Sequence, residues 1–307
     1  MTNTLKKSEL NNDTKSGVLF ALPWFIGFLL FSFYPIIMSA YYSFTDFSTI
    51  KSPEWVGFDN YLNLFQDSRF WISLYNTLFF VVFSVPLTIL LGLVTALLLN
   101  LKVHGRSLFR AIFYVPSIFP VVASTMVWVW IFDPDNGFLN QFLGIFGVPK
   151  INWLGNPMFT RWSIIIMALW GVGTTTVIFL AAIQDVPKGL YEAAELDGAG
   201  RVGKFFHITI PSISHVVLYQ IILAIINGFQ YFTQVYVVLT AQGGSYVQSG
   251  EGGPNDSLLM YPLYLYYNAF AYLKMGKASA MAWILFVITA ILTALLVKTS
   301  KKWVDLQ

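Results

Sequence analysis

Long apolar runs constrain this chain more than any other feature of its sequence. Six stretches are apolar along their length and nearly free of charge, and they cover residues 18–40, 74–99, 108–132, 162–183, 216–239 and 278–297. A helix needs roughly 20 such residues to cross about 30 Å of hydrocarbon, and it satisfies its backbone hydrogen bonds internally. Membrane-spanning β-strands alternate apolar and polar residues instead. The runs therefore predict an all-α polytopic membrane protein with six transmembrane helices.

The composition agrees with a membrane location and removes several kinds of site. Of the 307 residues, 56% are hydrophobic and 11% are charged, which is too apolar for a water-soluble chain of this length. Cysteine is absent, so disulfides, thiolate metal sites and cysteine nucleophiles are excluded. His104, His207 and His215 follow no metal-ligand spacing, and we predict no metal site.

The basic residues predict the orientation of the spans, because cytoplasmic loops of membrane proteins carry an excess of lysine and arginine. With the N-terminus inside, twelve of the eighteen basic residues fall on the cytoplasmic side, namely Lys6, Lys7, Lys15, Lys102, Arg106, Arg110, Lys188, Arg201, Lys204, Lys298, Lys301 and Lys302. We thus expect a multi-pass protein of the cell (plasma or inner) membrane with a cytoplasmic leader (1–17), a transmembrane domain (18–298) and a cytoplasmic tail (299–307). Both termini are predicted to be cytoplasmic.

The inner loop at about 184–215 is longer than a simple connector requires. Asp185 is expected to cap a helix whose first turn holds Pro187, and Gly198 with Gly200 is expected to interrupt that helix. A second short helix, at about 201–209, is expected to end before Pro211, which cannot donate a backbone hydrogen bond. The pattern predicts two short helices between the fourth and fifth spans.

Small residues leave one surface of this loop without bulky side chains, so that another protein could approach its backbone closely. Ala193, Ala194, Gly198 and Ala199 carry little or no side chain, and Glu192 and Asp197 add negative charge beside them. An amphipathic helix lying on lipid is the alternative, but such a helix needs a bulky apolar face with a basic rim. The first helix of the loop is net acidic. We interpret the loop as an element that docks into the groove of another protein.

A nucleotide site in the same loop is not supported. The stretch 198–204 reads GAGRVGK and fits the phosphate-binding pattern GxxxxGK, but Phe205 stands where a serine or threonine would hold magnesium. A phosphate-binding loop also links a buried strand to a helix, whereas a helix precedes this one. The spans show no catalytic constellation either, so we expect neither a cofactor bound by this chain nor a catalytic residue.

The loop resembles the signature of a known family. Nine positions fit the string EAAxxDGAxxxxxFxxIxxP, namely Glu192, Ala193, Ala194, Asp197, Gly198, Ala199, Phe205, Ile208 and Pro211. The string resembles the loop of permease subunits in binding-protein-dependent ABC importers. The opening LFALPWFIGFLLFSFYPIIMSAYYSFTDF and the later YNAFAYLKMGKASAMAW resemble the carbohydrate-uptake branch of that family, and within it the first of the two paired permeases.

This resemblance implies a transport function and a set of partners. It implies that the loop forms coupling helices inserted into a cleft of a cytoplasmic ATPase, with Glu192, Ala193, Ala194, Asp197 and Gly198 in the contact. Ala199, Phe205 and Pro211 complete the motif. It also implies a second related permease, two copies of an ATPase that uses ATP and Mg, and an extracytoplasmic solute-binding protein that delivers a sugar.

The fifth span carries a polar stripe. Gln220, Asn227, Gln230, Tyr231 and Gln234 recur at helical spacing and would share one face of a continuous helix. Amides and a hydroxyl exchange hydrogen bonds with sugar hydroxyls, which predicts that Asn227, Gln230, Tyr231 and Gln234 border the substrate pathway. The same groups also join membrane helices to one another. The sequence leaves both roles open.

Three classes of function are compatible with six spans. An ABC permease for sugars is favoured, with glycerol phosphate or another polyol as alternative solutes. An ion-coupled secondary transporter would need ionisable residues inside the membrane, and the six apolar runs nearly lack them. A membrane enzyme would need a catalytic constellation near an interface. The first class explains the docking loop, and the other two do not.

Overall fold

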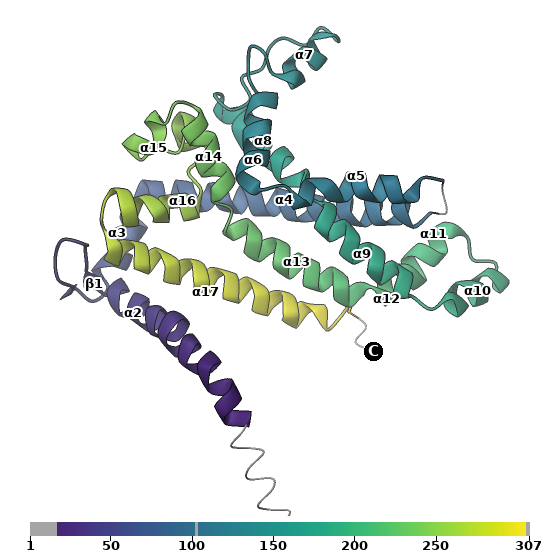
Figure 1. Cartoon of the computed structure of the whole chain (residues 1–307), viewed down its shortest axis with the longest axis horizontal. Coiled ribbons are helices and arrows are strands. Elements are labelled where there is room, and N and C mark those ends of the chain that lie inside the picture. The colour runs from purple at the N-terminus through teal and green to yellow at the C-terminus, as the bar shows by residue number, and fades with distance from the viewer. Residues whose placement is uncertain (1–16, 102–103, 305–307) are drawn as a thin grey trace, which may run out of the picture.

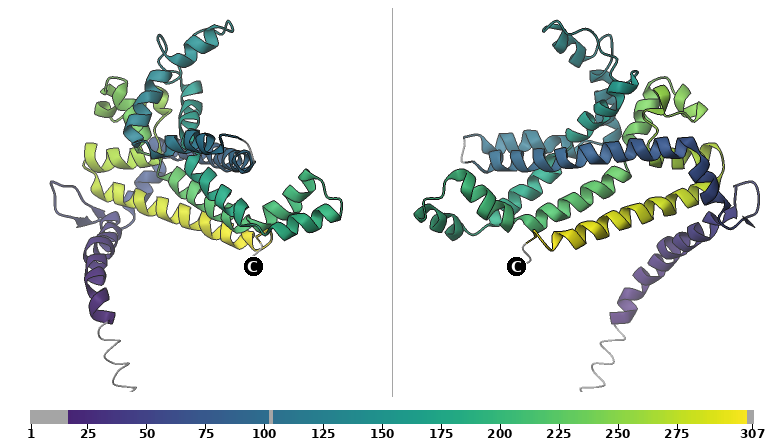
Figure 2. Two further views of the ribbon diagram at one scale, coloured as in Figure 1. Left: turned by 45° about the vertical axis from the view of Figure 1, so that its right-hand side comes forward. Right: turned by 180° about the vertical axis from the view of Figure 1, so that it is seen from behind.

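The protein is a bundle of long helices, and the loop between the fourth and fifth spans, the first span and the segment that carries α7 (Phe138–Gly144) project from it (Figures 1 and 2). The structure, a computed structural model, describes residues 17–101 and 104–304. The predicted leader lies outside the described residues except for Gly17, and so do the last three residues of the predicted tail. The boundaries of the three predicted regions remain predictions.

The described residues contain four to six candidate membrane spans, and six, as predicted, if each bent pair of helices is one span. Four helical stretches are long and apolar enough to cross a membrane: Gly17–Ser43, α4 (Ser68–Asn100), Ser214–Ala241 and α17 (Met275–Ser300). Two bent pairs complete the set, and they are α5 (Arg106–Ile118) with α6 (Val121–Ile131), and α8 (Pro157–Leu169) with α9 (Gly173–Asp185).

The third span is not the single helix that its apolar run predicts. Its two halves meet at an angle of 101°. Phe119 and Pro120, which join the halves, both have extended backbone angles. A residue before proline is pushed out of the helical region, and proline itself lacks the backbone donor that would continue the ladder. The proline therefore separates the span into two helices.

The fourth span bends by 47° at residues 170–172, where no proline predicts a bend. Immediately after the break, α9 approaches α5 closely. A Cβ atom on Gly173 would lie 2.4 Å from the carbonyl oxygen of Phe113, so only glycine allows this distance. The contact places α5 beside α9, and the two helices later frame a basic cluster.

The first span lies apart from the bundle along most of its length (Figure 2). It includes the π-helix η1 (Leu29–Phe33) and α2 (Tyr34–Ser43), and none of its most apolar window is buried within the chain. Within the first span, α2 is the part that packs on α17. A hairpin of two short strands follows α2, with β1 (Thr45–Asp46) paired antiparallel with β2 (Glu54–Trp55), and α3 (Asp59–Gln66) comes next.

Short helices also lie in the two longer segments between spans at 133–161 and 240–277. They are α7 (Phe138–Gly144), α15 (Ser245–Ser249), η3 (Pro254–Asp256), α16 (Tyr261–Tyr266) and the π-helix η4 (Tyr267–Ala271). The main apolar core joins α4 to α8, α16 and the fifth and sixth spans, around Phe70, Ile164, Phe229 and Tyr261. A second core, around Phe179 and Ile213, joins α4 and α9 to the start of the fifth span.

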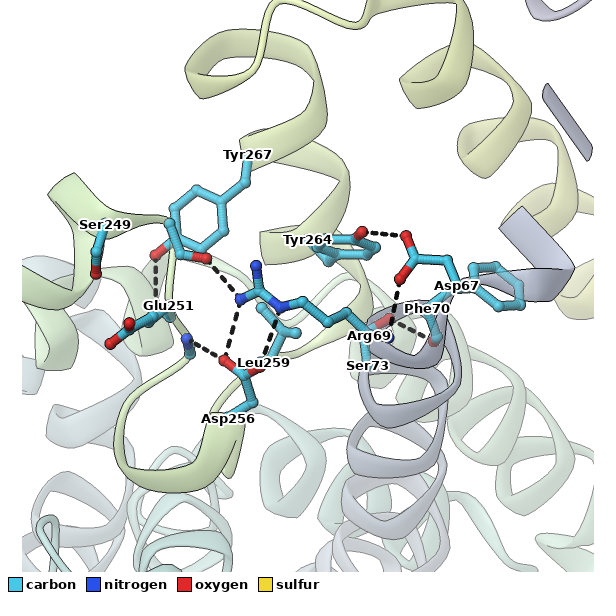
Figure 3. A network of polar contacts seen from close by, with 12 residues as sticks. Asp67, Arg69, Phe70, Ser73, Ser249, Glu251, Asp256, Leu259, Tyr264 and Tyr267 are labelled. Carbon is cyan, nitrogen blue, oxygen red and sulfur yellow. Dashed lines mark hydrogen bonds and ion pairs between the residues drawn. The ribbon is translucent and has the colours of Figure 1, made fainter. Parts of the chain in front are cut away.

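A polar network ties the N-terminal end of α4 to the segment that precedes α16 (Figure 3). The guanidinium of Arg69 donates to both carboxylate oxygens of Asp256, at 3.0 Å each, and to the carbonyl of Gly250 at 2.7 Å. Asn255 and Asp256 both have positive φ angles, of 50° and 51°, which are strained for residues other than glycine. Arg69 thus fixes a strained turn.

A second ion pair joins the same end of α4 to α17. The Nζ of Lys277 lies 2.7 Å from Asp67 Oδ2, and the Tyr264 hydroxyl donates to the same oxygen. Burial disfavours the charged carboxylate, but the hydrogen bonds from Lys277 and Tyr264 outweigh it and hold the pKa of Asp67 below its ordinary value. The ion pair is therefore present at neutral pH and at moderately acidic pH.

This shift predicts a loss of stability in acid. A carboxyl whose pKa is lower in the folded state contributes stability above its unfolded pKa of about 3.9, and the contribution is lost as the pH falls through the folded pKa. We expect the melting temperature of the wild type to drop more steeply between about pH 5 and pH 3 than that of Asp67→Asn. The measurement is thermal unfolding of detergent-solubilised protein, and parallel pH profiles would contradict the assignment.

Candidate functional site

The predicted coupling loop is a compact helical hairpin that projects from the end of the bundle where α17 also ends (Figure 1). It consists of α10 (Lys188–Leu196), α11 (Arg201–Lys204), the π-helix η2 (Phe205–Thr209) and α12 (Ile210–Ser212). The prediction that Asp185 caps the first helix is wrong, because Asp185 is the last residue of α9. Pro187 precedes α10 instead, without a side-chain cap.

The second half of the loop does not end before Pro211 as predicted. The helical path continues through η2 and α12 as far as Ser212. A proline ring collides with the carbonyl four residues earlier in a regular α-helix, which here belongs to His207. The wider π-turn over Phe205–Thr209 ends two residues before Pro211 and changes the spacing of the backbone carbonyls there, so the proline fits without ending the helix.

The turn between the two helices explains the glycine of the motif. The N–H of Gly198 donates to the carbonyl of Glu195 at 3.1 Å, and the N–H of Ala199 donates to that of Ala194 at 2.8 Å. This pair of bonds closes a helix through a residue in the left-handed conformation. Gly198 has a φ of +79°. Glycine is therefore required by the backbone at this position.

Two side-chain contacts hold the hairpin together. The Tyr191 hydroxyl lies 3.0 Å from Thr209 Oγ1, and Lys204 forms an ion pair with Glu195. Tyr191 also packs against the core formed by α4 and α9. The loop is thus a folded unit anchored to the spans and not an extended connector.

The motif residues differ in exposure. Glu192, Ala193, Asp197 and Gly198 are exposed, whereas Ala194, Ala199, Phe205 and Pro211 are half-buried. Glu192 and Asp197 form no ion pair with any other described residue. Four of the five residues predicted to contact an ATPase therefore lie on an accessible surface, with two carboxylates beside two small residues, and the fifth, Ala194, is half-buried.

A groove of about 1080 Å³ separates the coupling loop from the spans. Asp185 and Leu190 line one part of it, and His207 and His215 line another. The loop consequently contacts the bundle along one edge, and its far side faces away from the chain.

The predicted polar stripe of the fifth span is not one face of a continuous helix. The span consists of α13 (Ser214–Phe229) and α14 (Thr233–Ala241), and residues 230–232 form a break between them. The stripe prediction is wrong in this respect, because the helical phase is lost at the break.

The five residues of the stripe consequently have different surroundings. Gln220 is buried, Asn227 and Gln230 are exposed, and Gln234 is half-buried. Tyr231 turns into the core, with its ring 4.4 Å from that of Phe80. The Tyr231 hydroxyl is buried and has no hydrogen-bond partner within the described part of the chain. Only Asn227 and Gln230 present an accessible amide.

Gln230 borders a second groove, of about 780 Å³, between α13 and α17. Thr289 and Thr293 line it from α17, one turn apart, and Lys298 stands at one end. Sequence reasoning missed the two threonines. Their i, i+4 spacing in an otherwise apolar span was the available signal, but it does not reveal which span lies opposite.

Comparison with known proteins decides the class of the chain. Residues 88–305 match the family described as binding-protein-dependent transport system inner membrane component. The chain belongs to this family. The permease is 38% identical to the probable ABC transporter permease protein YesP of Bacillus subtilis (strain 168), over 98% of its own length and 95% of that protein. It is 32% identical to the trehalose/maltose transport system permease protein MalF of Thermococcus litoralis, over 98% and 99% of the two chains.

A solved structure has the same fold. The permease matches a chain of a bacterial ABC transporter involved in the import of the acidic polysaccharide alginate, with a TM-score of 0.74 and 22% identity. The match covers 97% of this chain and 100% of that chain. The resemblance to ABC importer permeases, the all-helical polytopic fold and the location in the cell's inner membrane are thus confirmed. The permease is a transport subunit.

Proposed function

We propose that the permease forms half of the translocation pathway of an ABC importer for a carbohydrate, a sugar or an oligosaccharide delivered by an extracytoplasmic solute-binding protein. The observation that carries this proposal is similarity along the full length to a trehalose/maltose permease, since both chains are covered almost completely. The accessible amide of Gln230 and the hydroxyls of Thr289 and Thr293 suit a neutral solute rich in hydroxyls.

ATP hydrolysis belongs, in this proposal, to two copies of a cytoplasmic ATPase that bind ATP and Mg. The exposed face of α10, with Ala193 between Glu192 and Asp197, enters a cleft of one ATPase. The folded hairpin supports this role, because a docking element transmits motion only if it is rigid and anchored. Closure of the ATPases on ATP draws the coupling loops together and reorients the spans, and hydrolysis resets them.

A second, related permease completes the pathway. The groove between α13 and α17 is open to one side of this chain, so a single copy does not enclose a solute. The first span also presents aromatic side chains away from the bundle, with Trp24 and Phe25 more than half exposed. Both features support a partner in the membrane that covers surfaces this chain leaves open.

The proposal is tested by isolating the assembly from its own host. We expect a C-terminally tagged permease, solubilised in mild detergent, to co-purify with an ATPase and a second permease. Reconstituted with the binding protein, the assembly should take up a labelled maltose- or trehalose-type sugar in preference to glycerol phosphate. A stable lone chain that transports without ATP would contradict the proposal of an ABC importer. Uptake of glycerol phosphate alone would show that the solute is a polyol and not a sugar.

Gln230→Leu is expected to weaken sugar uptake selectively. Losing one or two hydrogen bonds of about 1 kcal/mol each should raise the KM for the sugar by about tenfold, with a smaller effect on the maximal rate. Gln220→Leu is the matched control, because Gln220 is buried in the same span and should change thermal stability and not KM. Unchanged KM values for every sugar tested would assign Gln230 to helix packing.

A further inference from the structure

Two arginines converge on one amide at the predicted cytoplasmic end of the third span. Arg106 and Arg110 lie one turn apart in α5, and Gln184 belongs to the last turn of α9. With the Gln184 amide oxygen facing them, Arg110 Nη2 donates to it at 2.8 Å and Arg106 Nη2 donates at 3.3 Å. The two guanidinium groups therefore meet in one place between two helices that contact each other.

The positive charge of this cluster is not balanced by the chain. Neither arginine forms an ion pair with an acidic residue in 17–101 or 104–304, and the first turn of α5 holds no acidic residue. Like charges at positions i and i+4 repel, and the start of a helix adds partial positive charge. The Arg110 Nε is buried and lacks a hydrogen-bond partner among the described residues. The cluster is electrostatically unfavourable unless an anion joins it.

The surroundings of the cluster match the boundary between lipid tails and headgroups. Leu108 and Ile112 on α5 are more than half exposed, and Phe109 is nearly so. They lie within the same two turns as the arginines, so α5 presents an apolar surface and a basic end side by side. Such a boundary is where basic pockets between transmembrane helices bind anionic headgroups.

Ordinary surface arginines at this depth extend separately toward water. Arg106 and Arg110 instead point at a shared acceptor, which holds two planar groups of donors in a fixed arrangement. Guanidinium groups bind phosphate oxygens through paired hydrogen bonds. A phosphate placed beside Gln184 can accept from both arginines.

We propose that Arg106, Arg110 and Gln184 form a binding site for the phosphate of an anionic phospholipid in the inner leaflet. The lipid phosphate balances the two arginines, and its acyl chains lie on the exposed apolar face of α5. The site differs from the solute pathway and from the coupling surface, and it does not depend on which solute is carried. Free phosphate shares the headgroup chemistry but lacks the apolar contact.

The site is tested by native mass spectrometry of the whole transporter, purified in detergent and supplied with phosphatidylglycerol. Arg106→Gln with Arg110→Gln should retain the lipid about thirtyfold more weakly, since each basic residue at an anionic surface contributes about fivefold. Lys298→Gln with Lys301→Gln removes the same charge from exposed positions on the inner end of α17 and should leave retention unchanged.

A second variant keeps the test informative if the double arginine variant does not fold. Gln184→Glu places a carboxylate between the arginines at an exposed position, so it should displace the lipid while both arginines remain. Equal retention by the wild type and Gln184→Glu would overturn the proposal. If millimolar inorganic phosphate displaced the lipid, the ligand of the site would be free phosphate and not a phospholipid. Loss of the ATPase from the variants with unchanged lipid would identify an acidic protein partner instead.

Discussion

Replacing Ala193 with arginine is expected to reduce solute uptake by about a hundredfold while the permease still inserts and folds. Ala193 is exposed on α10, so the larger side chain is accommodated without disturbing the bundle. The arginine would bring a bulky positive charge into the ATPase cleft, where no acidic group is positioned to pair with it. A cost of about 3 kcal/mol, typical of a mismatched charge at an interface, corresponds to roughly a hundredfold weaker contact.

The measurements are uptake of labelled sugar in cells and sugar-stimulated ATPase activity of the purified complex. Ala193→Ser is the matched control, because it keeps the surface low and neutral and should retain nearly full activity. If the arginine variant transported normally and kept its ATPase, α10 would not be the docking surface. If Ala193→Ser failed equally, the helix itself and not its low profile would be the sensitive feature.

Arg69→Ala is expected to lower the unfolding free energy by about 2–3 kcal/mol. The variant leaves the carboxylate of Asp256 without its cation and the strained turn at Asn255 and Asp256 without its anchor. Fully buried pairs cost about 3–5 kcal/mol when broken, and the lower figure reflects side chains that are 27% and 19% exposed. The expected fall in melting temperature is about 5 °C or more.

A double-mutant cycle with Asp256→Ala separates the ion pair from other roles of Arg69. If Arg69 acts mainly through Asp256, the double variant should be little less stable than Arg69→Ala. Lys150→Ala is the control, because Lys150 and Asp135 form an exposed ion pair that should contribute almost nothing measurable. Equal melting temperatures for Arg69→Ala and Lys150→Ala would show that the outer network does not stabilise the fold.

The number of spans was predictable from the sequence because a run of apolar residues is a local property. The bends were predictable only in part. Pro120 predicts the break in the third span, because the proline ring itself prevents a regular helix from continuing. The breaks at 170–172 and 230–232 contain no such residue, and they depend on packing between spans. Arg69 and Asp256 lie 187 residues apart, so no local pattern relates them.

The short helices of the loop at 184–215 were predictable for the same reason, whereas the groove beside Gln230 was not. A continuous motif of about twenty residues specifies α10, the turn at Gly198 and the helices that follow. The groove beside Gln230 instead joins residues from two spans, and Thr289 and Thr293 gain their meaning only from the helix opposite. Within the break at 230–232, the adjacent residues Gln230 and Tyr231 have different surroundings, because Gln230 is exposed and the Tyr231 ring packs on Phe80.

The contact between α2 and α17 has a consequence for biogenesis. The first span enters the bilayer early in synthesis, but the long helix that α2 packs against most extensively is α17, the last span to be made. Contacts between such distant segments form slowly and late. We therefore expect the first span to remain exposed to lipid and to chaperones until translation of α17 is complete, and a ribosome stalled before Met275 should leave it fully open to cross-linking with its surroundings.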